Sequence, residues 1–590
     1  MIGFLRWARS IGMGMLNVTI GAILFVVLLI GVLAIYGAAR GDGLPGNMVL
    51  ALDLRGPIQD SVVSSPLDFG PPPLTVMDVI LALDHAQHDS RVKGVLMRVG
   101  SGDLSVAQAE EIGAALKRFR AQGKFVIAHS QGFQSTGLGD YMLATDAGQI
   151  WMQPKSVFGP SGAGAGAVFL KGFFDKIDAD PQIAKRSDFK SAADMFMEKD
   201  YTAPDRLQTT ALLNSWVQTA TATAAADRKM AASAVSAAFD NSPQFAGEAK
   251  AAGLIDKIGY DDDAQDAAER QAGYGSKTVA MRAYIKATRA SLSAGGPRIA
   301  LIAGEGEIVD GTAGGGIDGG GVIAGDDFAA AIRAATKDST IKAIVLRVDS
   351  PGGSVTASDQ ILEAVKKARA AGKPVVVSMG GVAASGGYYI ACDADRIVAE
   401  PGTITGSIGV LTGKVSVGKS LALLGITADE IGVGKNALFD SAISPYTDQQ
   451  WAALNHQADV IYADFTQKVS EGRKLPLADV QAIAKGRVWS GADAKPIKLV
   501  DELGGFWTAV AAAKKLAGIE AASPVSFIRY PRPKGFFGAL NAMFGDSAQG
   551  LEVLARVQAL ADTPPMRMVG RALAETPRGG VQLLAPGLPN

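Results

Sequence analysis

The sequence predicts an α/β protein made of two tandem copies of one domain, preceded by a single membrane-spanning helix. Three observations support this prediction: a long apolar segment near the N-terminus, a sequence pattern that occurs twice, and strands that alternate with helices within each copy. The chain has 590 residues, which exceeds the size of one ordinary domain and allows two large cores.

The apolar segment is long enough to cross a membrane. No charged residue occurs between Ser10 and Ala39, and residues 18–39 are almost wholly apolar. About 20 apolar residues span a bilayer, whereas the core of a signal peptide is usually about 7–15 residues long. We therefore expect 18–39 to be a transmembrane anchor. A cleaved signal peptide is the alternative, because Gly37 is followed by two alanines that suit a cleavage site.

The charges before this segment indicate its orientation. Arg6 and Arg9 precede it, and positively charged flanks favour the cytoplasmic side. We expect residues 1–17 to stay in the cytoplasm and the rest of the chain to be exported.

An internal repeat follows the anchor. Residues 89–99 (DSRVKGVLMRV) match residues 338–348 (DSTIKAIVLRV), which lie 249 positions later. Further along the chain the spacing between matching segments falls to 247 and then to 245. Small, orderly steps of this kind are left by insertions in the loops of a duplicated domain, so internal duplication is the first organisation to infer.

Each copy alternates strand and helix patterns. In the second copy, residues 341–349 and 374–380 are apolar and rich in β-branched residues. Between them, residues 359–372 place apolar residues at helical spacing and end with a glycine. Strands separated by helices of this length predict βαβ units and a mainly parallel sheet.

Boundaries follow from the repeat. We expect the first repeat at 46–287 and the second at 297–530, joined by a short linker. Residues 531–590 lose the periodic pattern and gain proline and glycine, which predicts a loosely ordered tail.

Composition excludes several functions. A net charge of −1 gives no electrostatic basis for binding nucleic acid. One cysteine, Cys392, leaves no internal disulfide and no cysteine-rich metal site. None of the four histidines has the HExxH spacing of a zinc site, and we expect neither a metal nor a cofactor; these histidines are His85, His88, His129 and His456.

Two glycine-rich loops of the second copy are suited to covalent catalysis. One is Asp349–Ser354, and the other is Gly380–Gly387, which contains Ser385. A serine among small residues at a strand-to-helix turn is presented as a nucleophile, and the first N–H groups of the helix face an anion. We therefore predict Ser385 as the nucleophile. Neither loop has the GxxxxGK[ST] or GxGxxG pattern of a phosphate-binding loop.

Three glycines are the predicted donors of an oxyanion hole. Gly386 follows the nucleophile directly, and Gly352 and Gly353 lie in the other loop. Small residues let a loop approach a carbonyl closely, and the loss of one donor would lower the rate about 10²–10³-fold.

The first copy lacks both the glycine-rich loops and the nucleophilic serine. Gly100–Leu104 replaces the first glycine loop, and no serine aligns with Ser385, because Thr136 or Leu138 lies there instead. We infer that the first copy supplies a different function.

These segments carry a resemblance to a known family. DSPGGSV, SMGGVAASGGYYIACDADRIVAEPGTITGSIGV and GRVWSGADAKPIKLVDELG resemble signal peptide peptidase A (protease IV) in its long, duplicated form. The resemblance runs from the anchor to about residue 510. It implies a serine peptidase with a Ser–Lys dyad on a fold similar to crotonase and Clp protease, with the nucleophile in the second repeat and the base in the first.

The resemblance also implies a setting. Family members assemble as membrane-bound rings, which are tetrameric in the long form, so the resemblance implies a homotetramer. Together with the expected anchor, it implies a single-pass protein of the inner (cytoplasmic) membrane with its catalytic domains on the periplasmic side. Its substrates would be cleaved signal peptides and other apolar peptides.

The family's Tyr-Lys-Ser-Ala run resembles Phe189–Ala192, which makes Lys190 the expected general base. A solvated lysine has a pKa near 10.4, and a neutral amine near pH 7 requires burial that penalises the charge by about 4–5 kcal/mol. We expect apolar neighbours to provide that burial. Lys435, 245 positions later, is the alternative base. The expected neighbours are Phe189, Ala192, Ala193, Met195 and Phe196.

Two other functions fit the same fold. An acyl-CoA hydratase or isomerase of the crotonase type could use the same glycine loops, but acyl-CoA is cytoplasmic and the lysine run does not belong to it. A catalytically inactive membrane scaffold would not need Ser385 between two intact glycine loops. Serine-reactive probes distinguish the three.

Overall fold

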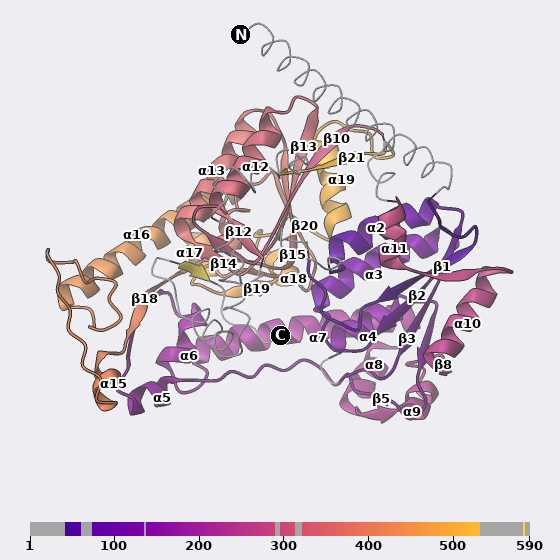
Figure 1. Ribbon diagram of the computed structural model, residues 1–590, viewed down its shortest axis with the longest axis horizontal. Coiled ribbons are helices and arrows are strands. Elements are labelled where there is room, and N and C mark those ends of the chain that lie inside the picture. Colours follow the sequence, from indigo (N-terminus) through magenta and orange to yellow (C-terminus); the bar gives the residue numbers. More distant parts are fainter. Residues whose placement is uncertain are drawn as a thin grey trace, which may run out of the picture.

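The computed structural model contains two α/β repeats that lie side by side, with the first repeat on the right of Figure 1 and the second at its upper centre. The predicted anchor at 18–39 lies outside the described residues, as does most of the predicted tail. Among the residues that the structure describes, no helix has the length and apolar character to cross a membrane. The described residues are 42–60, 73–134, 137–288, 295–312, 321–531 and 582–584.

The first repeat is built on a parallel six-stranded sheet with the order β8-β4-β3-β2-β1-β9. Buried strands with runs such as VKGVLMRV form its centre, as expected for a parallel sheet covered on both faces. Its strands are β1 (Met48–Asp53), β2 (Val92–Val99), β3 (Phe125–Ser130), β4 (Gln149–Met152), β8 (Lys257–Ile258) and β9 (Lys277–Ala280).

The second repeat has the same strand order, β20-β16-β15-β13-β10-β21, in its own sheet. Two further strands, β17 (Ile404–Gly406) and β19 (Val488–Ser490), extend this sheet beyond β15. The predicted duplication is therefore confirmed in the topology. The shared strands are β10 (Arg298–Glu305), β13 (Ile341–Ser350), β15 (Val375–Ala384), β16 (Arg396–Ala399), β20 (Glu502–Leu503) and β21 (Ser526–Arg529).

Helices correspond as closely as strands. Both α3 (Val106–Ala121) and α13 (Val355–Ala370) have 16 residues and begin after a serine N-cap, 249 positions apart. Both α7 (Ala203–Arg228) and α16 (Asp448–Arg473) have 26 residues and end at a left-handed lysine, 245 positions apart. The other pairs are α2 (Val76–His88) with α12 (Gly325–Lys337), α5 (Lys171–Lys176) with α15 (Gly418–Leu423), and α10 (Asp261–Ala272) with α19 (Phe506–Leu516).

One hydrophobic core joins the two repeats. It contains residues of the first sheet such as Leu50 and Val95 together with Val345 and Val376 of the second sheet. Phe506 of α19 lies in the same cluster. Apolar surface buried between the repeats holds them in a fixed relation, because burial stabilises by about 25 cal/mol per Å².

A third sheet, of order β12-β11-β14-β22-β18-β6, crosses from one repeat to the other. Strand β6 (Asp180–Arg186) leaves the first repeat and pairs antiparallel with β18 (Val410–Ser416) of the second, over seven residue pairs. Strand β22 (Gln582–Leu584), within the predicted tail, lies between β14 (Gly352–Ser354) and β18. Its remaining strands are β11 (Glu307–Val309) and β12 (Val322–Ala324).

Candidate active site

Ser385 occupies the turn between β15 and the short helix α14 (Gly386–Tyr389). Its backbone has φ +55° and ψ −116°, a region that a residue with a Cβ rarely adopts and that stores strain at functional sites. The Ser385 N–H donates to the Gly406 carbonyl at 2.8 Å, which fixes the turn. This is the strained strand-to-helix geometry that presents a nucleophilic serine.

The predicted glycines gather beside this turn. A Cβ on Gly386 would lie 3.1 Å from the Gly353 nitrogen, and a Cβ on Gly353, at φ +150°, would lie 2.0 Å from the Ile308 carbonyl oxygen. Only glycine fits at either position without a shift. The Gly352 N–H donates to Ser350 Oγ at 3.1 Å, so Gly353 and Gly386 are the better placed of the three predicted donors.

Ser354 has a structural role. It is the N-cap of α13, and its Oγ accepts from the Ala357 N–H at 3.2 Å. It also donates to Asp310 at 2.6 Å. Ser350 and Ser354 therefore hold the glycine loop.

Lys190 reaches this turn from the first repeat. It follows β6, whose pairing with β18 carries it across the interface. The Lys190 Nζ lies 2.7 Å from Ser385 Oγ, 3.0 Å from Ser407 Oγ and 3.1 Å from the Ser407 carbonyl oxygen. A neutral amine has two hydrogens and one lone pair, so Ser407 can take both hydrogens while the lone pair faces Ser385.

The Lys190 side chain is fully buried. Burial penalises the charged form and lowers the pKa of Lys190 well below its ordinary value. A lysine with a lowered pKa is a competent proton acceptor at a pH where a solvated lysine is not.

The source of this burial differs from the sequence-based expectation. Met195 is 38% exposed, and the Phe196 ring stacks on Phe174. Instead, the second repeat covers the lysine, since a Cβ on Gly486 would lie 2.6 Å from the Lys190 Cβ. The expectation fails for Met195 and Phe196 because sequence neighbours were taken as the surroundings, whereas part of the environment comes from a segment almost 300 residues away.

The other sequence candidates lie elsewhere. Lys435 is exposed, and Thr136 lies outside the described residues. Leu138 is buried at the start of α4 (Leu138–Thr145). His129 is buried in the first repeat with its Nε2 3.2 Å from the Gly259 carbonyl oxygen. In the described part of the chain, no cluster of three or more side chains could hold a metal ion.

Sequence reasoning missed Ser407. It lies in the segment GTITGSIGV that carries the family resemblance, but nothing singled out its serine. Its φ of +51° places a non-glycine residue in the left-handed region directly after Gly406, and a serine after a glycine at a strand end is the signal that could have found it.

Comparisons with known proteins agree with this site. Two segments, residues 118–275 and 367–520, match the model of peptidase family S49, and residues 324–401 match the model of Clp protease. Both family S49 matches fall within the two repeats, and the second contains Ser385.

Several curated relatives match over most of their length. Protease 4 of Salmonella typhi is 34% identical over 466 residues, which cover 76% of this chain and 72% of that protein. The chloroplastic serine protease SPPA of Arabidopsis thaliana is 28% identical over 551 residues, covering 90% and 80%. Protease 4 of Haemophilus influenzae is 28% identical over 524 residues, covering 83% of each.

These matches confirm the resemblance to signal peptide peptidase A and favour hydrolysis of peptides over acyl-CoA chemistry or an inactive scaffold. The chain belongs to peptidase family S49 and is a serine endopeptidase.

Proposed function

We propose that this peptidase works through a dyad of Ser385 and Lys190, in which the second repeat supplies the nucleophile and the first supplies the base. The observation that carries the proposal is the distance of 2.7 Å between Lys190 Nζ and Ser385 Oγ in a fully buried environment. A nucleophile and a base within hydrogen-bond reach, with the base oriented by a third group, form the pattern of an activated nucleophile. Ser407 is that third group.

The reaction begins when neutral Lys190 accepts the hydroxyl proton of Ser385. The Ser385 oxygen attacks the peptide carbonyl carbon, and the carbonyl oxygen becomes an oxyanion. The C–N bond then breaks as the Lys190 ammonium gives its proton to the leaving amine, which leaves an acyl-enzyme on Ser385. Water attacks this ester while Lys190 takes one of its protons, and the proton returns to Ser385 as the acid product leaves.

The oxyanion is held by the N–H groups of Gly386 and Gly353, with Gly352 the third predicted donor. Gly386 is the first residue of α14, and the first N–H groups of a helix have no partner within the helix. Preorganised donors of this kind stabilise the charge that develops in the transition state.

Substrate binds as an extended strand between β14 and β18. Support comes from β22, which occupies this gap with antiparallel pairing to both neighbours. Its Leu583 lies opposite Gly353, so a strand seated there passes the oxyanion donors. Backbone pairing of an added strand provides affinity without demanding a particular sequence, which suits an enzyme that degrades varied peptides.

Cleaved signal peptides and other apolar peptides are the proposed substrates, and the proposed site is the periplasmic side of the inner (cytoplasmic) membrane. The long apolar segment at 18–39 supports a single-pass anchor that holds the exported repeats beside the bilayer, where cleaved signal peptides remain.

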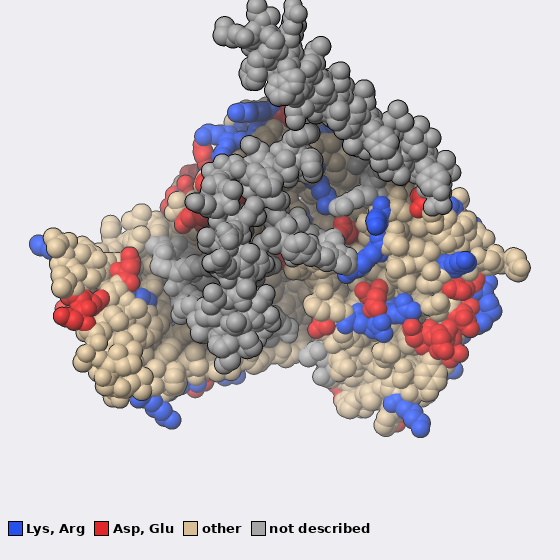
Figure 2. Space-filling view, in the orientation of Figure 1, with Lys and Arg blue, Asp and Glu red and all other residues tan. Residues whose placement is uncertain are grey.

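We also propose that the chain forms a homotetrameric ring. Residues 425–435 are the second-repeat counterpart of β6 and Lys190, yet they carry strongly exposed apolar side chains, including Ile431 at 92% and Val433 at 95%. The first-repeat counterpart of β18, residues 163–169, forms no strand. Around α15 the surface is mostly uncharged (Figure 2).

Pairing these two segments between successive chains would repeat the β6–β18 contact that each chain makes internally. Head-to-tail contacts of this type form a ring when the rotation between successive subunits closes. Lys435 would then face the first repeat of the next subunit.

A fluorophosphonate probe tests the dyad. We expect the purified enzyme to be labelled at Ser385 and to cleave a synthetic signal peptide, and we expect Ser385→Ala and Lys190→Ala to abolish both. Lys435→Ala is the matched control and should keep both. Labelling that persists in Ser385→Ala would refute the nucleophile, and a loss of activity in Lys435→Ala would reassign the base.

Native mass spectrometry in detergent tests the ring. We expect a tetramer for the parent chain and monomers for a variant with Ile431→Asp and Val433→Asp. Tyr274 is fully exposed on the first repeat, so Tyr274→Asp is a control that should remain tetrameric. A tetramer that survives both aspartates would exclude this contact.

A further inference from the structure

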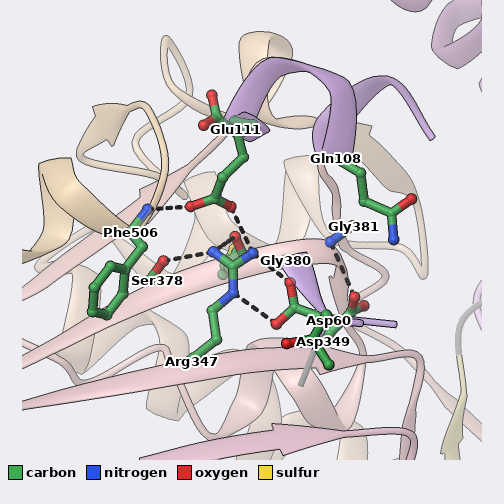
Figure 3. A network of polar contacts seen from close by, with 12 residues as sticks. Asp60, Gln108, Glu111, Arg347, Asp349, Ser378, Gly380, Gly381 and Phe506 are labelled. Atoms are coloured by element: carbon green, nitrogen blue, oxygen red, sulfur yellow. Dashed lines mark hydrogen bonds and ion pairs between the residues drawn. The ribbon is translucent and has the colours of Figure 1, made fainter. Parts of the chain in front are cut away.

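A buried arginine ties the two repeats together beside the active site. Arg347 lies in β13 and is 1% exposed. Its guanidinium donates from Nε and Nη2 to the two carboxylate oxygens of Asp60, and from Nη2 to Glu111 at 2.6 Å. Figure 3 shows this guanidinium at the centre of the network, with Glu111 above it and Asp60 beside it. Both carboxylates belong to the first repeat.

The third guanidinium nitrogen of Arg347, Nη1, contacts its own repeat. Nη1 donates to Ser378 Oγ at 2.9 Å and to the Met379 carbonyl at 3.2 Å. Both acceptors lie in β15, the strand that leads to Ser385. Arg347 itself lies in β13, the strand that leads to Gly352 and Gly353. One side chain therefore contacts the nucleophile strand, the oxyanion strand and the repeat that carries Lys190.

Asp349, two residues further along β13, acts on the same strand. Val348 lies opposite Met379 but Ser350 lies opposite Ala383, so β15 bulges between these points. The Asp349 carboxylate accepts from the Gly381 N–H at 3.3 Å and the Val382 N–H at 3.0 Å inside that bulge. A bulge re-aims the residues that follow it, and the next turn presents Ser385.

The electrostatics favour a fixed arrangement. Burial alone would lower the pKa of Arg347, but ion pairs with Asp60 and Glu111 outweigh it and raise the pKa. Further titratable groups surround this centre, and burial raises the pKa of the three carboxyl groups among them. Glu111 also accepts from the Phe506 N–H at 2.6 Å. A buried network of this kind adds little net stability compared with apolar packing, and its best-attested use is to fix one geometry. The surrounding groups are Glu110, Arg118, Asp349 and Glu400.

We propose that Arg347 is a positioning residue that holds the first repeat, and with it Lys190, in register with the strands that present Ser385 and Gly353. This inference rests on the Ser385–Lys190 dyad proposed above. A misplacement of about 1 Å in such a constellation can lower the rate about 10²-fold. Loosening the contact would also admit water to Lys190 and shift its pKa towards the ordinary value.

The first repeat provides a matched control. Arg98 occupies the corresponding position in β2, 249 residues earlier, and pairs with both carboxylate oxygens of Asp261. This ion pair lies within the first repeat and touches neither strand of the site. Arg98→Met should therefore change the rate little.

The test removes the network without leaving a buried charge unpaired. The triple variant Arg347→Met, Asp60→Asn, Glu111→Gln replaces the three charged groups with neutral ones of similar size. Arg347→Lys keeps the charge but cannot reach all the partners. In the triple variant we expect kcat to fall about 100-fold with KM changed little, and the acid limb of the pH–rate profile to move to higher pH. Arg347→Lys should change kcat and the acid limb in the same directions, but by smaller amounts.

Each kcat is divided by the concentration of competent sites, which the amplitude of fluorophosphonate labelling gives. A purely structural role would lower that amplitude and leave the pH limb unchanged, and this result in either variant would overturn the proposal. If the triple variant fails to fold, Arg347→Lys decides by the same criterion. Labelling that persists in Ser385→Ala would instead show that the dyad itself is wrong.

Discussion

Replacing Lys190 by methionine should make folding stability less dependent on pH while it abolishes catalysis. Burial lowers the pKa of Lys190 from its ordinary value of 10.5. Between the folded and unfolded pKa values, the unfolded chain carries a proton on this amine that the folded chain lacks. The free energy of unfolding of the parent enzyme therefore rises with pH between these two pKa values, by about 1.36 kcal/mol per pH unit from this one group.

The size of this effect follows from the difference between the pH and the pKa of Lys190 in the unfolded chain. At pH 8.5, two units below 10.5, this group destabilises the parent enzyme by at most about 2.7 kcal/mol. Methionine removes that penalty but also removes the hydrogen bonds to Ser407, each worth about 0.5–1.5 kcal/mol. The absolute difference between the two proteins is therefore smaller than 2.7 kcal/mol. Its dependence on pH is unaffected by these losses.

Urea unfolding of the full chain in detergent, at intervals between pH 7.5 and 9.5, measures this dependence. The stability advantage of Lys190→Met over the parent should shrink by about 1.36 kcal/mol for each unit of rising pH. Lys435→Met, at the exposed counterpart in the second repeat, should follow the parent at every pH. A difference between Lys190→Met and the parent that stays flat across this range would mean that the folded enzyme keeps the proton, and the proposed base would be wrong.

Three further outcomes follow from the site. Gly353→Ala would place a Cβ 2.0 Å from a backbone oxygen and should lower kcat at least about 100-fold. Gly372 is also at positive φ but has open space around it, so Gly372→Ala should retain the parent rate. Equal rates for the two variants would exclude the oxyanion role of Gly353. Ser407→Ala keeps the Cβ at this left-handed position and should lower kcat/KM about 2- to 12-fold through one lost hydrogen bond. An unchanged kcat/KM would argue against Ser407 as the group that orients Lys190. Ending the chain at Pro531 removes β22 from the gap between β14 and β18 and should lower KM for a peptide without changing kcat. Removal of residues 585–590 alone should change neither KM nor kcat. An unchanged KM in the longer deletion would argue against this gap as the substrate groove.

Much of the fold could be read from the sequence because duplication leaves a record in the chain. The spacing of 249 that links DSRVKGVLMRV to DSTIKAIVLRV also links β2 to β13 and α3 to α13. Strand and helix patterns within each copy predicted the parallel sheets, since buried parallel strands are continuous apolar runs. Ser385 was found for a related reason: a nucleophile turn is a local arrangement of small residues.

The rest of the site depends on contacts between distant segments, which local patterns do not record. Ser407 contributes through its distance from Lys190, and Gly486 through its packing against the same side chain. The sheet that joins β6 to β18 and β22 links residues hundreds of positions apart. Arg347 looked like one more residue of a buried strand, and only the position of Asp60 and Glu111 across the interface reveals its role.

Dividing the proposed dyad between two repeats would make the base depend on assembly of the whole fold. Lys190 loses its solvent only when β6 pairs with β18 and Gly486 packs on the lysine. Before the repeats dock, the same amine is solvated and protonated, and it cannot accept a proton from serine. A chain with only the first repeat unfolded would therefore carry the Ser385 turn without an active base. For a serine endopeptidase, this linkage would confine activity to the fully folded state.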